Sequence, residues 1–442
     1  MLLIGNGTVL TLGAHNRVIP CGAVLVDDAK IQEVGHTGDL RQRFPGARYI
    51  DVKGKLIMPG MINTHMHLYS TFARGMDAKS QPPRTFGDIL NGLWWKLDKA
   101  LTPDDCYYSA LVPMLESIKN GTTTIVDHHA SPYAVNDSLT TLAKAGQIVG
   151  IRAAYSYEVS DRDGEQIRQA GIAENSSFLA SQQANSGAMV AGLFGLHASL
   201  TLSDRTLEQC REAAAESGAG FHVHVAEGIE DLEDSLAKSG LRVVERLHKF
   251  GILGPKTIAV HCVHVNEAEI ELLHETETQV VHNPESNMGN AVGAAPVLNM
   301  LKQGVPVGLG TDGYTCDMFE SAKVANCLQK HEAANPSVGW TEVPHMLYDN
   351  NSTMAGRLFG GTFGQLSAGA WADIIVVDYI PATPLTEANW SGHLLFGVSG
   401  RAVETTVING RIRMLKREMV DIDEEAVYAR ARELAHNLWM RI

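Results

Sequence analysis

The sequence predicts an α/β protein made of a (β/α)8 barrel and a small β-sandwich that is built from both ends of the chain. Apolar strand-like runs alternate with amphipathic helical segments through the middle of the chain. Short strand-like segments separated by turn signals occur near the two ends. Side chains that bind metals or transfer protons follow several of the central strands, and a barrel of this kind places its functional residues at those strand ends.

The two terminal segments should form one discontinuous domain, residues 1–58 with residues 363–442. The first segment alternates apolar and polar positions, with turn signals such as Gly5-Asn6-Gly7, which is the pattern of short antiparallel strands. A similar pattern returns near the other end, where Asn409-Gly410 is a strong hairpin signal. Because a small sheet has an apolar face that needs a cover, we expect the two segments to pack together.

Residues 59–362 should form the barrel. A doubly wound open sheet would not need chemistry from its first, fifth, sixth and eighth strands together, whereas a closed barrel brings these strand ends to one mouth. The last helix should run from about Glu424 to Met440 after the cap Asp423 and pack on the outside. The eight strands are expected to end near His67, His129, Glu158, His197, Glu227, Cys262, Asn283 and Asp312.

Bulk properties narrow the class of protein. A chain of 442 residues exceeds what one small core fills. The formal charge of -14, without a basic block, argues against nucleic acid as a partner. No uninterrupted apolar window of about 18 residues is present and the N-terminus lacks a basic start, so we expect neither export nor a membrane span. Six cysteines without Cys-x-x-Cys spacing indicate reduced thiols and a cytoplasmic location.

His65 and His67 are the first candidate metal ligands. In an extended strand they project to the same side, about 6.6 Å apart, and two imidazoles so placed suit one divalent metal. A bare His-x-His pair is more often two packed polar residues, so the pair needs support from elsewhere. Three later strand-like runs give that support, since they end at His224 with Glu227, at His261, and at Asp312.

With these motifs in the right order over nearly its whole length, the chain resembles the amidohydrolase superfamily. The similarity is to the branch of aminohydrolases that act on ring systems, which includes adenosine-homologue deaminases, guanine deaminases and triazine chlorohydrolases. Within that branch the chain is most similar to the aminohydrolases called SsnA. The resemblance implies a terminal β-sandwich attached to the barrel, and homo-oligomers are common among such enzymes.

The resemblance implies a catalytic site for one divalent metal ion, with zinc the first choice and iron the second. His65, His67 and His224 would supply imidazoles and Asp312 a carboxylate, which leaves a position for water. The metal would lower the pKa of this water, and Asp312 would take its second proton as hydroxide attacks a ring carbon bearing an amino group. His261 resembles the family histidine that hydrogen-bonds the attacking water; a fourth imidazole ligand is the alternative.

Glu227 lies three residues after His224, and the pair matches the family's H-x-x-E motif. The resemblance implies that Glu227 protonates a ring nitrogen and carries a proton to departing ammonia, while a solvated loop glutamate is the alternative. His197 matches a substrate-contacting histidine of the branch, with a buried strand-end residue as the alternative. His128 and His129 follow strand 2, and we expect one of them, taken as His129, to face the substrate.

The predicted substrate contacts are His197, His129, Trp95 and Asp98. Trp94, Trp95 and Phe72 could stack on a heterocycle, although aromatic residues beside a helix are more often core. Asp98 is the shorter counterpart of a glutamate that resembles a ribose contact in nucleoside-acting members. By this resemblance, Tyr157 occupies the place where some members carry an arginine after strand 3. Both differences argue against an adenosine-type substrate.

We therefore expect a metal-dependent hydrolase that removes an amino group from a purine-like or related nitrogen heterocycle, with a small-molecule substrate and water as its partners. One alternative is a chlorohydrolase or ring-amide hydrolase that uses the same attack. A non-catalytic metal-stabilised scaffold is another. A nicotinamide oxidoreductase is a third, because residues 308–313 spell G-x-G-x-x-G, but Asp312 would place a carboxylate where a pyrophosphate should bind. Ammonia release separates the first function from the others.

Overall fold

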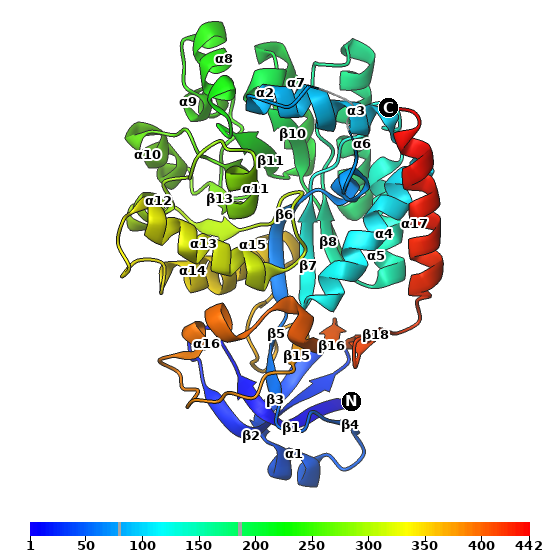
Figure 1. Cartoon of the computed structure of the whole chain (residues 1–442), viewed down its shortest axis with the longest axis vertical. Coiled ribbons are helices and arrows are strands. Elements are labelled where there is room, and N and C mark those ends of the chain that lie inside the picture. The colour runs from blue at the N-terminus through cyan, green and yellow to red at the C-terminus, as the bar shows by residue number, and fades with distance from the viewer. Residues whose placement is uncertain (78–80, 184–187) are drawn as a thin grey trace.

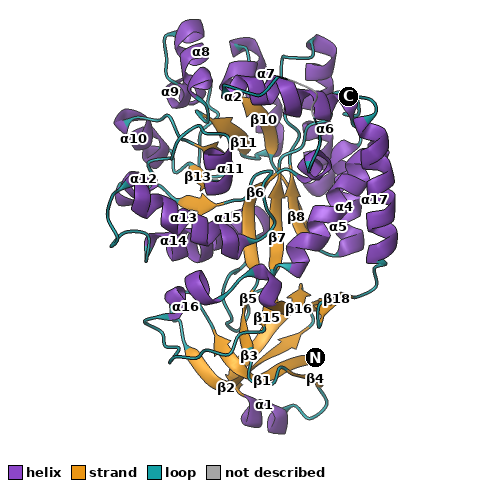
Figure 2. Cartoon of the chain, viewed as in Figure 1, coloured by secondary structure: helices purple, strands orange, loops and turns teal. Residues whose placement is uncertain are grey.

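The computed structural model describes residues 1–77, 81–183 and 188–442 of the chain. In Figure 1 these residues form two lobes, with a barrel and its helices above and a sheet that contains the N-terminus below. The C-terminus lies beside the barrel, at the end of the last helix. Figure 2 shows the barrel strands at the centre of the upper lobe and most of the helices outside them.

Eight parallel strands, counted over the described residues, form the barrel that the sequence predicts. Isolated bridges between Val159 and Leu196 and between Met66 and Asp312 join its two hydrogen-bonded groups, β6 to β9 and β10 to β14. We count β9 and β10 as one strand because only Leu193 separates them, and its N–H still donates to a carbonyl of β8. The strands are β6 (Met61–Met66), β7 (Thr122–Asp127), β8 (Arg152–Tyr155), β9 (Val190–Gly192), β10 (Phe194–Ala198), β11 (Phe221–Val225), β12 (Ile258–His261), β13 (Gln279–His282) and β14 (Val307–Leu309).

Helices connect successive strands on the outside of the barrel, and local sequence signals start several of them. Thr102 and Asp105 form a capping box at the start of α4, and Asn266 and Glu269 do the same for α10. The helices of this lobe are α4 (Pro103–Lys119), α5 (Ser138–Val149), α6 (Glu165–Gln183), α7 (Asp204–Ser217), α8 (Ile229–Ser239), α9 (Val243–Lys249), α10 (Glu267–Glu275), α11 (Pro284–Gly289), α12 (Val297–Lys302), α13 (Met318–Glu332), α14 (Glu342–Pro344) and α15 (Asn351–Phe359), with the short turns η1 (Leu68–Ala73), η3 (Ser199–Thr201) and η4 (His345–Asn350).

Nine strands from the two ends of the chain form one continuous mixed sheet in the lower lobe. Its order is β18-β17-β16-β15-β5-β1-β2-β3, with β4 paired to β1. Asn409 and Gly410 have φ of 52° and 73° in the turn between β16 and β17, so the predicted hairpin is confirmed. The elements are β1 (Leu2–Leu10), β2 (Val18–Asp27), β3 (Lys30–His36), α1 (Thr37–Arg43), β4 (Arg48–Asp51), β5 (Leu56–Pro59), β15 (Ile374–Val377), α16 (Trp390–Gly397), η5 (Gly400–Ala402), β16 (Val403–Ile408), β17 (Arg411–Leu415) and β18 (Glu418–Met419).

The last helix, α17 (Glu424–Trp439), packs mainly against α4 of the barrel (Figure 1). The side chain of Asp423 accepts a hydrogen bond from the N–H of Ala426, as the predicted cap should. At the other end, the indole N–H of Trp439 donates to the carbonyl of Phe72 at 2.7 Å. The helix therefore covers the barrel wall, and the division of the chain after residues 58 and 362 stays a prediction.

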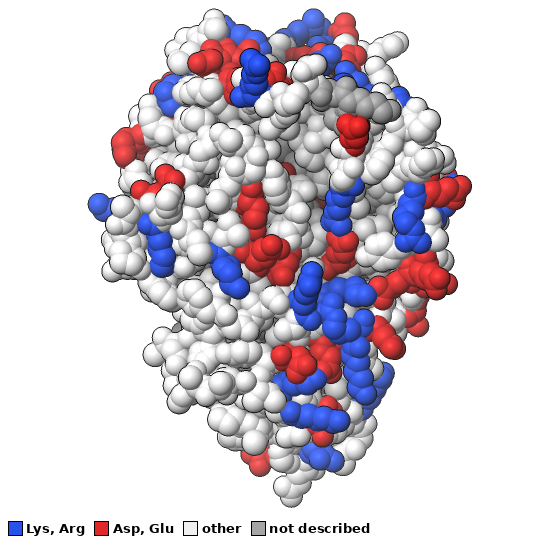
Figure 3. All heavy atoms as spheres, viewed as in Figure 1, with Lys and Arg blue, Asp and Glu red and all other residues white. Residues whose placement is uncertain are grey.

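Charged side chains of both signs share the face of the molecule shown in Figure 3. Lys and Arg side chains gather there together with Asp and Glu near the junction of the two lobes. All six cysteines lie in the described residues, and none of them forms a disulfide. No helix in the described part of the chain combines the length and the apolar character needed to cross a lipid bilayer.

A buried ion pair joins the barrel to the terminal sheet. Arg152, on β8, is fully buried, and its guanidinium contacts the Oδ2 of Asp373, next to β15. The other oxygen of Asp373 accepts the N–H of Asn409 at 2.8 Å. Arg152 also donates from Nε to the carbonyl of Ala188 at 2.8 Å. The pair is therefore held from both lobes.

We expect Asp373→Ala to destabilise the protein by about 3–5 kcal/mol, because it leaves a buried guanidinium without its carboxylate. The measurement is the midpoint of thermal unfolding by differential scanning calorimetry. Glu33→Ala is the control, since it removes the partly exposed ion pair with Arg43 and should change the midpoint little. Equal midpoints for the Asp373 and Glu33 variants would contradict the stabilising role of the buried pair.

Candidate metal centre and active site

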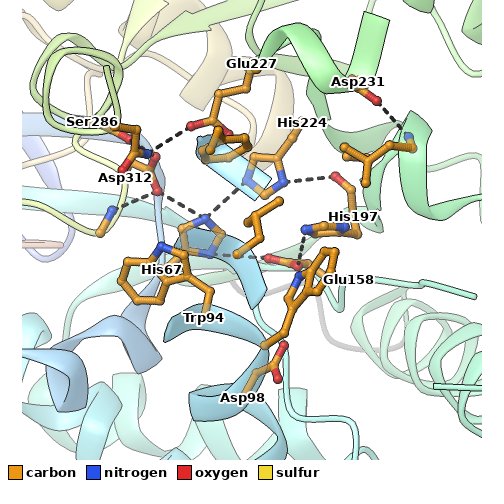
Figure 4. Close-up of a pocket in the computed structure, with 18 of the residues that line it drawn as sticks. His67, Trp94, Asp98, Glu158, His197, His224, Glu227, Asp231, Ser286 and Asp312 are labelled. Atoms are coloured by element: carbon orange, nitrogen blue, oxygen red, sulfur yellow. Dashed lines mark hydrogen bonds and ion pairs between the residues drawn. The ribbon is translucent and has the colours of Figure 1, made fainter. Parts of the chain in front are cut away.

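The carboxyl ends of the barrel strands surround one pocket, in which the side chains of His67, His224, Glu227 and Asp312 converge (Figure 4). A helical segment made of α2 (Phe86–Ile89), the π-helical turn η2 (Leu90–Trp94) and α3 (Trp95–Ala100) forms another wall of this pocket. Single π-turns often occur at functional sites, and here the turn ends at Trp94, which lines the pocket.

His67 and His224 both direct Nε2 to the same point, because their other ring nitrogens are occupied. Nδ1 of His67 donates to the carbonyl of His128 at 2.6 Å, and Nδ1 of His224 donates to the carbonyl of His197 at 2.9 Å. Their Nε2 atoms lie 3.2 Å apart. A carbonyl can only accept, so each Nε2 of the neutral ring keeps a free lone pair, as metal ligation requires.

His65 and Asp312 complete the group. Nδ1 of His65 lies 2.9 Å from Nε2 of His222, so His222 orients this ring from below, as expected of a residue deeper in the strand. Oδ1 of Asp312 lies 3.2 Å from Nε2 of His67 and 3.7 Å from Nε2 of His65. The hydroxyl of Ser286 donates to Oδ2 of Asp312 at 2.6 Å and fixes the carboxylate. The structure thus brings together the four residues predicted as metal ligands.

His261 lies next to this group and is compatible with either of its predicted roles. Its Nε2 is 3.6 Å from Oδ2 of Asp312 and 3.4 Å from Oε2 of Glu227. The side-chain amide of Asn287 contacts its Nδ1 at 2.9 Å. If the amide nitrogen faces the ring, Nε2 carries the proton and can donate to water or substrate; if the amide oxygen faces it, Nε2 is free to bind a metal.

Two observations on the chain itself show that these residues fit a divalent cation. Nε2 of His65 and Nε2 of His261 are buried without a hydrogen-bond partner, as expected of ring nitrogens that are left for a ligand. Burial opposes protonation of His67, but the neighbouring Asp312 and Glu158 raise its pKa to about 9, so the charges around this ring favour a cation, either a proton on Nε2 or a metal ion in its place. Imidazole nitrogens and one carboxylate are the donor set of catalytic zinc sites and also suit iron.

The backbone around the site adopts the left-handed conformation at four residues that are not glycine. These are Ala226, His261, Cys262 and Asp312, with φ between 47° and 73°. Such positions are strained for L-residues and cluster at functional sites, where the surrounding structure maintains them. Cys262 is fully buried, and burial raises the pKa of its thiol, so it is not the reactive thiolate that a nucleophile requires.

Glu227 lies at the mouth of the pocket on the loop after β11, as predicted. Its Oε1 accepts a hydrogen bond from the amide of Asn290 at 3.2 Å, and its Oε2 faces His261. Burial, and then the nearby charge of Asp312, raise the pKa of Glu227 well above its usual range. Burial acts in the same direction on Asp312, but hydrogen bonds from His65 and His67 outweigh it and hold the pKa of Asp312 well below its usual range. Two adjacent carboxyl groups with opposite shifts are suited to separate acid and base roles.

Three of the four predicted substrate contacts line the pocket: His197, Trp95 and Asp98. The fourth, His129, is fully buried and is not among the lining residues. Its Nε2 lies 2.9 Å from the hydroxyl of Ser131, and its ring packs edge-on against Tyr69, which does line the pocket. Phe72 also lies outside the lining, in the apolar cluster beneath α17, whereas Trp94 faces the pocket.

Sequence reasoning missed two charged residues after β8. The sequence predicts Glu158 only as a strand end, yet it is buried and lines the pocket between His67 and His197 (Figure 4). Arg162 has no predicted role, and it contacts Oδ2 of Asp98 at 2.5 Å. The position of Glu158 at the carboxyl end of a barrel strand was the signal that could have identified it. The pairing of Arg162 with a residue 64 positions away had no local signal.

The glycines that mimic a dinucleotide fingerprint have packing roles. A Cβ on Gly310 would lie 2.5 Å from the side chain of Asn283 and 2.9 Å from the carbonyl of His65. Asp312, within the same stretch, points at the histidines. The stretch therefore closes the barrel beside β6 and positions a carboxylate, which leaves no place for a pyrophosphate at this loop.

Comparison with known proteins gives consistent matches over most of the chain. The model of the "Amidohydrolase family" matches residues 56–413, and that of the "Imidazolonepropionase-like composite domain, bacteria" matches residues 22–47. A 5'-deoxyadenosine deaminase of Methanosarcina mazei is 33% identical, over 100% of this chain and 99% of its own. A 5-methylthioadenosine/S-adenosylhomocysteine deaminase of Pelotomaculum thermopropionicum is 32% identical, over 99% and 98%. The crystal structure of a zinc-bound adenosine deaminase from Xanthomonas campestris superposes with a TM-score of 0.87 at 25% identity, covering 99% of this chain and 98% of that one.

Proposed function

The chain belongs to the amidohydrolase family, and we propose that it is a metal-dependent aminohydrolase that removes an amino group, as ammonia, from a purine-like or related nitrogen heterocycle. The observation that carries the proposal is a set of overlapping ligand groups: His65, His67 and Asp312 lie together, His224 adjoins both His65 and His67, and the acid Glu227 lies beside Asp312. Full-length similarity to deaminases supports the same reaction.

The proposed metal ligands are His65, His67, His224 and Asp312, with zinc as the first choice and iron as the second. When bound there, the ion would supply a hydroxide nucleophile at neutral pH. Asp312 is the proposed acceptor of the proton from water, because it is a carboxylate beside the place where the water would bind, and the hydrogen bond from Ser286 to its Oδ2 fixes its orientation. His261, beside both carboxyl groups, would orient the water or polarise the substrate.

Glu227 would act as the proton shuttle. Burial and the charge of Asp312 raise its pKa and so favour the protonated carboxyl group, which would donate to a ring nitrogen when the ring carbon is attacked. It can then take the proton that Asp312 received and deliver it to the departing amine, since both face His261. The pair thus moves one proton from water to the leaving group.

Trp94, Trp95, Asp98 and His197 are the proposed substrate contacts, because all four line the pocket. The two curated relatives described above act, by their names, on adenosine-type nucleosides. In this chain Asp98 is already paired with Arg162, which favours a free or differently substituted heterocycle over a nucleoside. A cytoplasmic location and assembly into homo-oligomers stay predictions from the sequence.

The test is a screen of amino-heterocycles, including adenine, guanine, 2,6-diaminopurine and melamine, for ammonia release by the purified protein, with metal analysis of the same sample. We expect ammonia from at least one ring and about one zinc or iron per chain. A chlorinated triazine is included in the screen. Chloride release without ammonia would support a chlorohydrolase instead, and full metal occupancy without hydrolysis of any ring would support a metal-stabilised scaffold.

A further inference from the structure

We propose that Glu158 makes the pocket selective for a substrate that presents a cationic or N–H-rich group, such as an amidine or an amino-substituted ring edge. The inference rests on the function proposed above and specifies the chemistry of its substrate. Glu158 is 6% exposed and lies on the side of His67 that faces away from Asp312 (Figure 4).

The pocket has many more acidic than basic side chains. Among the described residues that line it there are five carboxyl groups and neither lysine nor arginine. The five are Asp98, Glu158, Glu227, Asp231 and Asp312. A pocket with this lining disfavours a substrate that carries a carboxylate or phosphate and favours one with donors or positive charge.

Four of these acids already have partners within the protein or an assigned task. Asp312 belongs to the proposed metal ligands, and Glu227 accepts the amide of Asn290. The two oxygens of Asp231 accept the backbone N–H groups of Leu200 and Ala226. Asp98 is paired with Arg162. Glu158 is the acid that remains.

The histidines around Glu158 do not satisfy it. Nδ1 of His67 is 3.4 Å away, but its proton is donated to the carbonyl of His128. Nδ1 of His128 lies 3.6 Å away and Nε2 of His197 lies 3.8 Å away, both beyond hydrogen-bond distance. Oε1 of Glu158 is consequently buried without a partner, which costs free energy unless a ligand supplies a donor.

A divalent ion bound by the proposed ligands would not supply the partner that Oε1 of Glu158 lacks. The imidazole of His67 presents Nε2 to Asp312 and His224 and Nδ1 to the side where Glu158 lies, so the ring separates the ion from Glu158. Asp312 and Glu227 lie on the ion's side and offset its charge. Glu158 therefore remains the acid of the opposite wall whose Oε1 has no hydrogen-bond donor.

Two neighbouring residues of that wall also keep polar atoms free. Oδ1 of Asp98 and Nε1 of Trp95 are buried without hydrogen-bond partners, and both residues line the pocket. Together with Glu158 they offer two acceptors and one donor. A ligand that matches these protein atoms needs more hydrogen-bond donors than acceptors. An amidine has such an edge, and so does a ring that carries an amino group beside a ring nitrogen.

Benzamidine tests the inference, because it is a flat ring with an amidinium group and its binding requires no turnover. We expect isothermal titration calorimetry to show about one benzamidine bound per chain of the metal-loaded protein. Glu158→Gln should weaken this binding by about 10- to 100-fold, the loss expected for a charge-assisted hydrogen bond. Glu158→Asp keeps the charge and should bind with intermediate affinity. The control Glu216→Gln, on the exposed surface of α7, should bind like the wild type.

Equal binding by wild type and Glu158→Gln, or no binding by wild type, would overturn the inference. Glu158 also lies in a group with His67, His128 and His224 whose spacing suits a metal. Metal content is therefore measured for each variant, and loss of metal from Glu158→Gln would identify a ligand instead of a specificity residue. If Glu158→Gln does not fold, the inference is tested by comparing the benzamidine affinities of the wild type and Glu158→Asp. If benzamidine binding depends on Glu158 but no ring releases ammonia, only the proposed function is contradicted. If a ring releases ammonia but benzamidine binding does not depend on Glu158, only this inference is contradicted.

Discussion

Replacing His65 and His67 together with alanine is expected to remove the metal and the activity at once. The change deletes two of the four proposed metal ligands. The two that remain should bind the ion too weakly to retain it during dialysis. Metal per chain, measured by inductively coupled plasma mass spectrometry after dialysis, should fall from about one to background. Turnover should fall to the level of chelator-treated wild type.

The matched control removes two exposed histidines, His248 and His331, and should keep both metal and activity. His222→Gln, which disturbs only the orientation of His65, should weaken metal binding by about 10- to 100-fold without abolishing it. His261→Asn decides between the two roles of that residue, because only a ligand would lose metal as His224→Ala does. Full metal occupancy in the His65, His67 double variant would refute the ligand assignment.

Changing Glu227 to glutamine should lower turnover by about 10²- to 10⁴-fold and leave the metal in place. Glutamine keeps the shape and most of the hydrogen bonding of the side chain but has no transferable proton. Glu227 lies beside His261 and Asn290 at the pocket mouth, so the metal ligands should be undisturbed. The measurements are steady-state ammonia release on a confirmed substrate and metal content of the same sample.

Glu233→Gln, on the exposed side of α8, is the control and should behave like the wild type. A loss of metal along with activity in the Glu227 variant would place the carboxylate among the ligands. A wild-type rate, with chemistry limiting the reaction, would mean that Glu227 is only a loop residue.

The residues that sequence reasoning placed well lie on strands or one short step beyond them. Alternation along β6 puts His65 and His67 on one side of the strand, and the same rule places His222 below His224 on β11. The barrel then brings the ends of β6, β11 and β14 together, so His224 and Asp312 could be predicted once the strands were counted.

The residues that it misjudged depend on loops and on distant contacts. β7 ends at Asp127, so alternation no longer determines which way His129 points, and it packs behind Tyr69. The sequence does not predict the ion pair of Asp98, because its partner, Arg162, comes from a loop after another strand. The missing partner of Glu158 is a property of the assembled pocket, which a linear sequence does not display.

On the ribosome, strand β5 emerges long before its partner β15. β5 ends at Pro59 and β15 begins at Ile374, so roughly 300 residues are made in between, which takes about 15–60 s at ~5–20 residues per second. During that interval the nascent chain carries an unpaired apolar strand edge, a site at which partly made copies can pair with one another. The closing of the sheet therefore waits for the completion of the barrel, and chaperone supply during synthesis should influence the yield of folded protein.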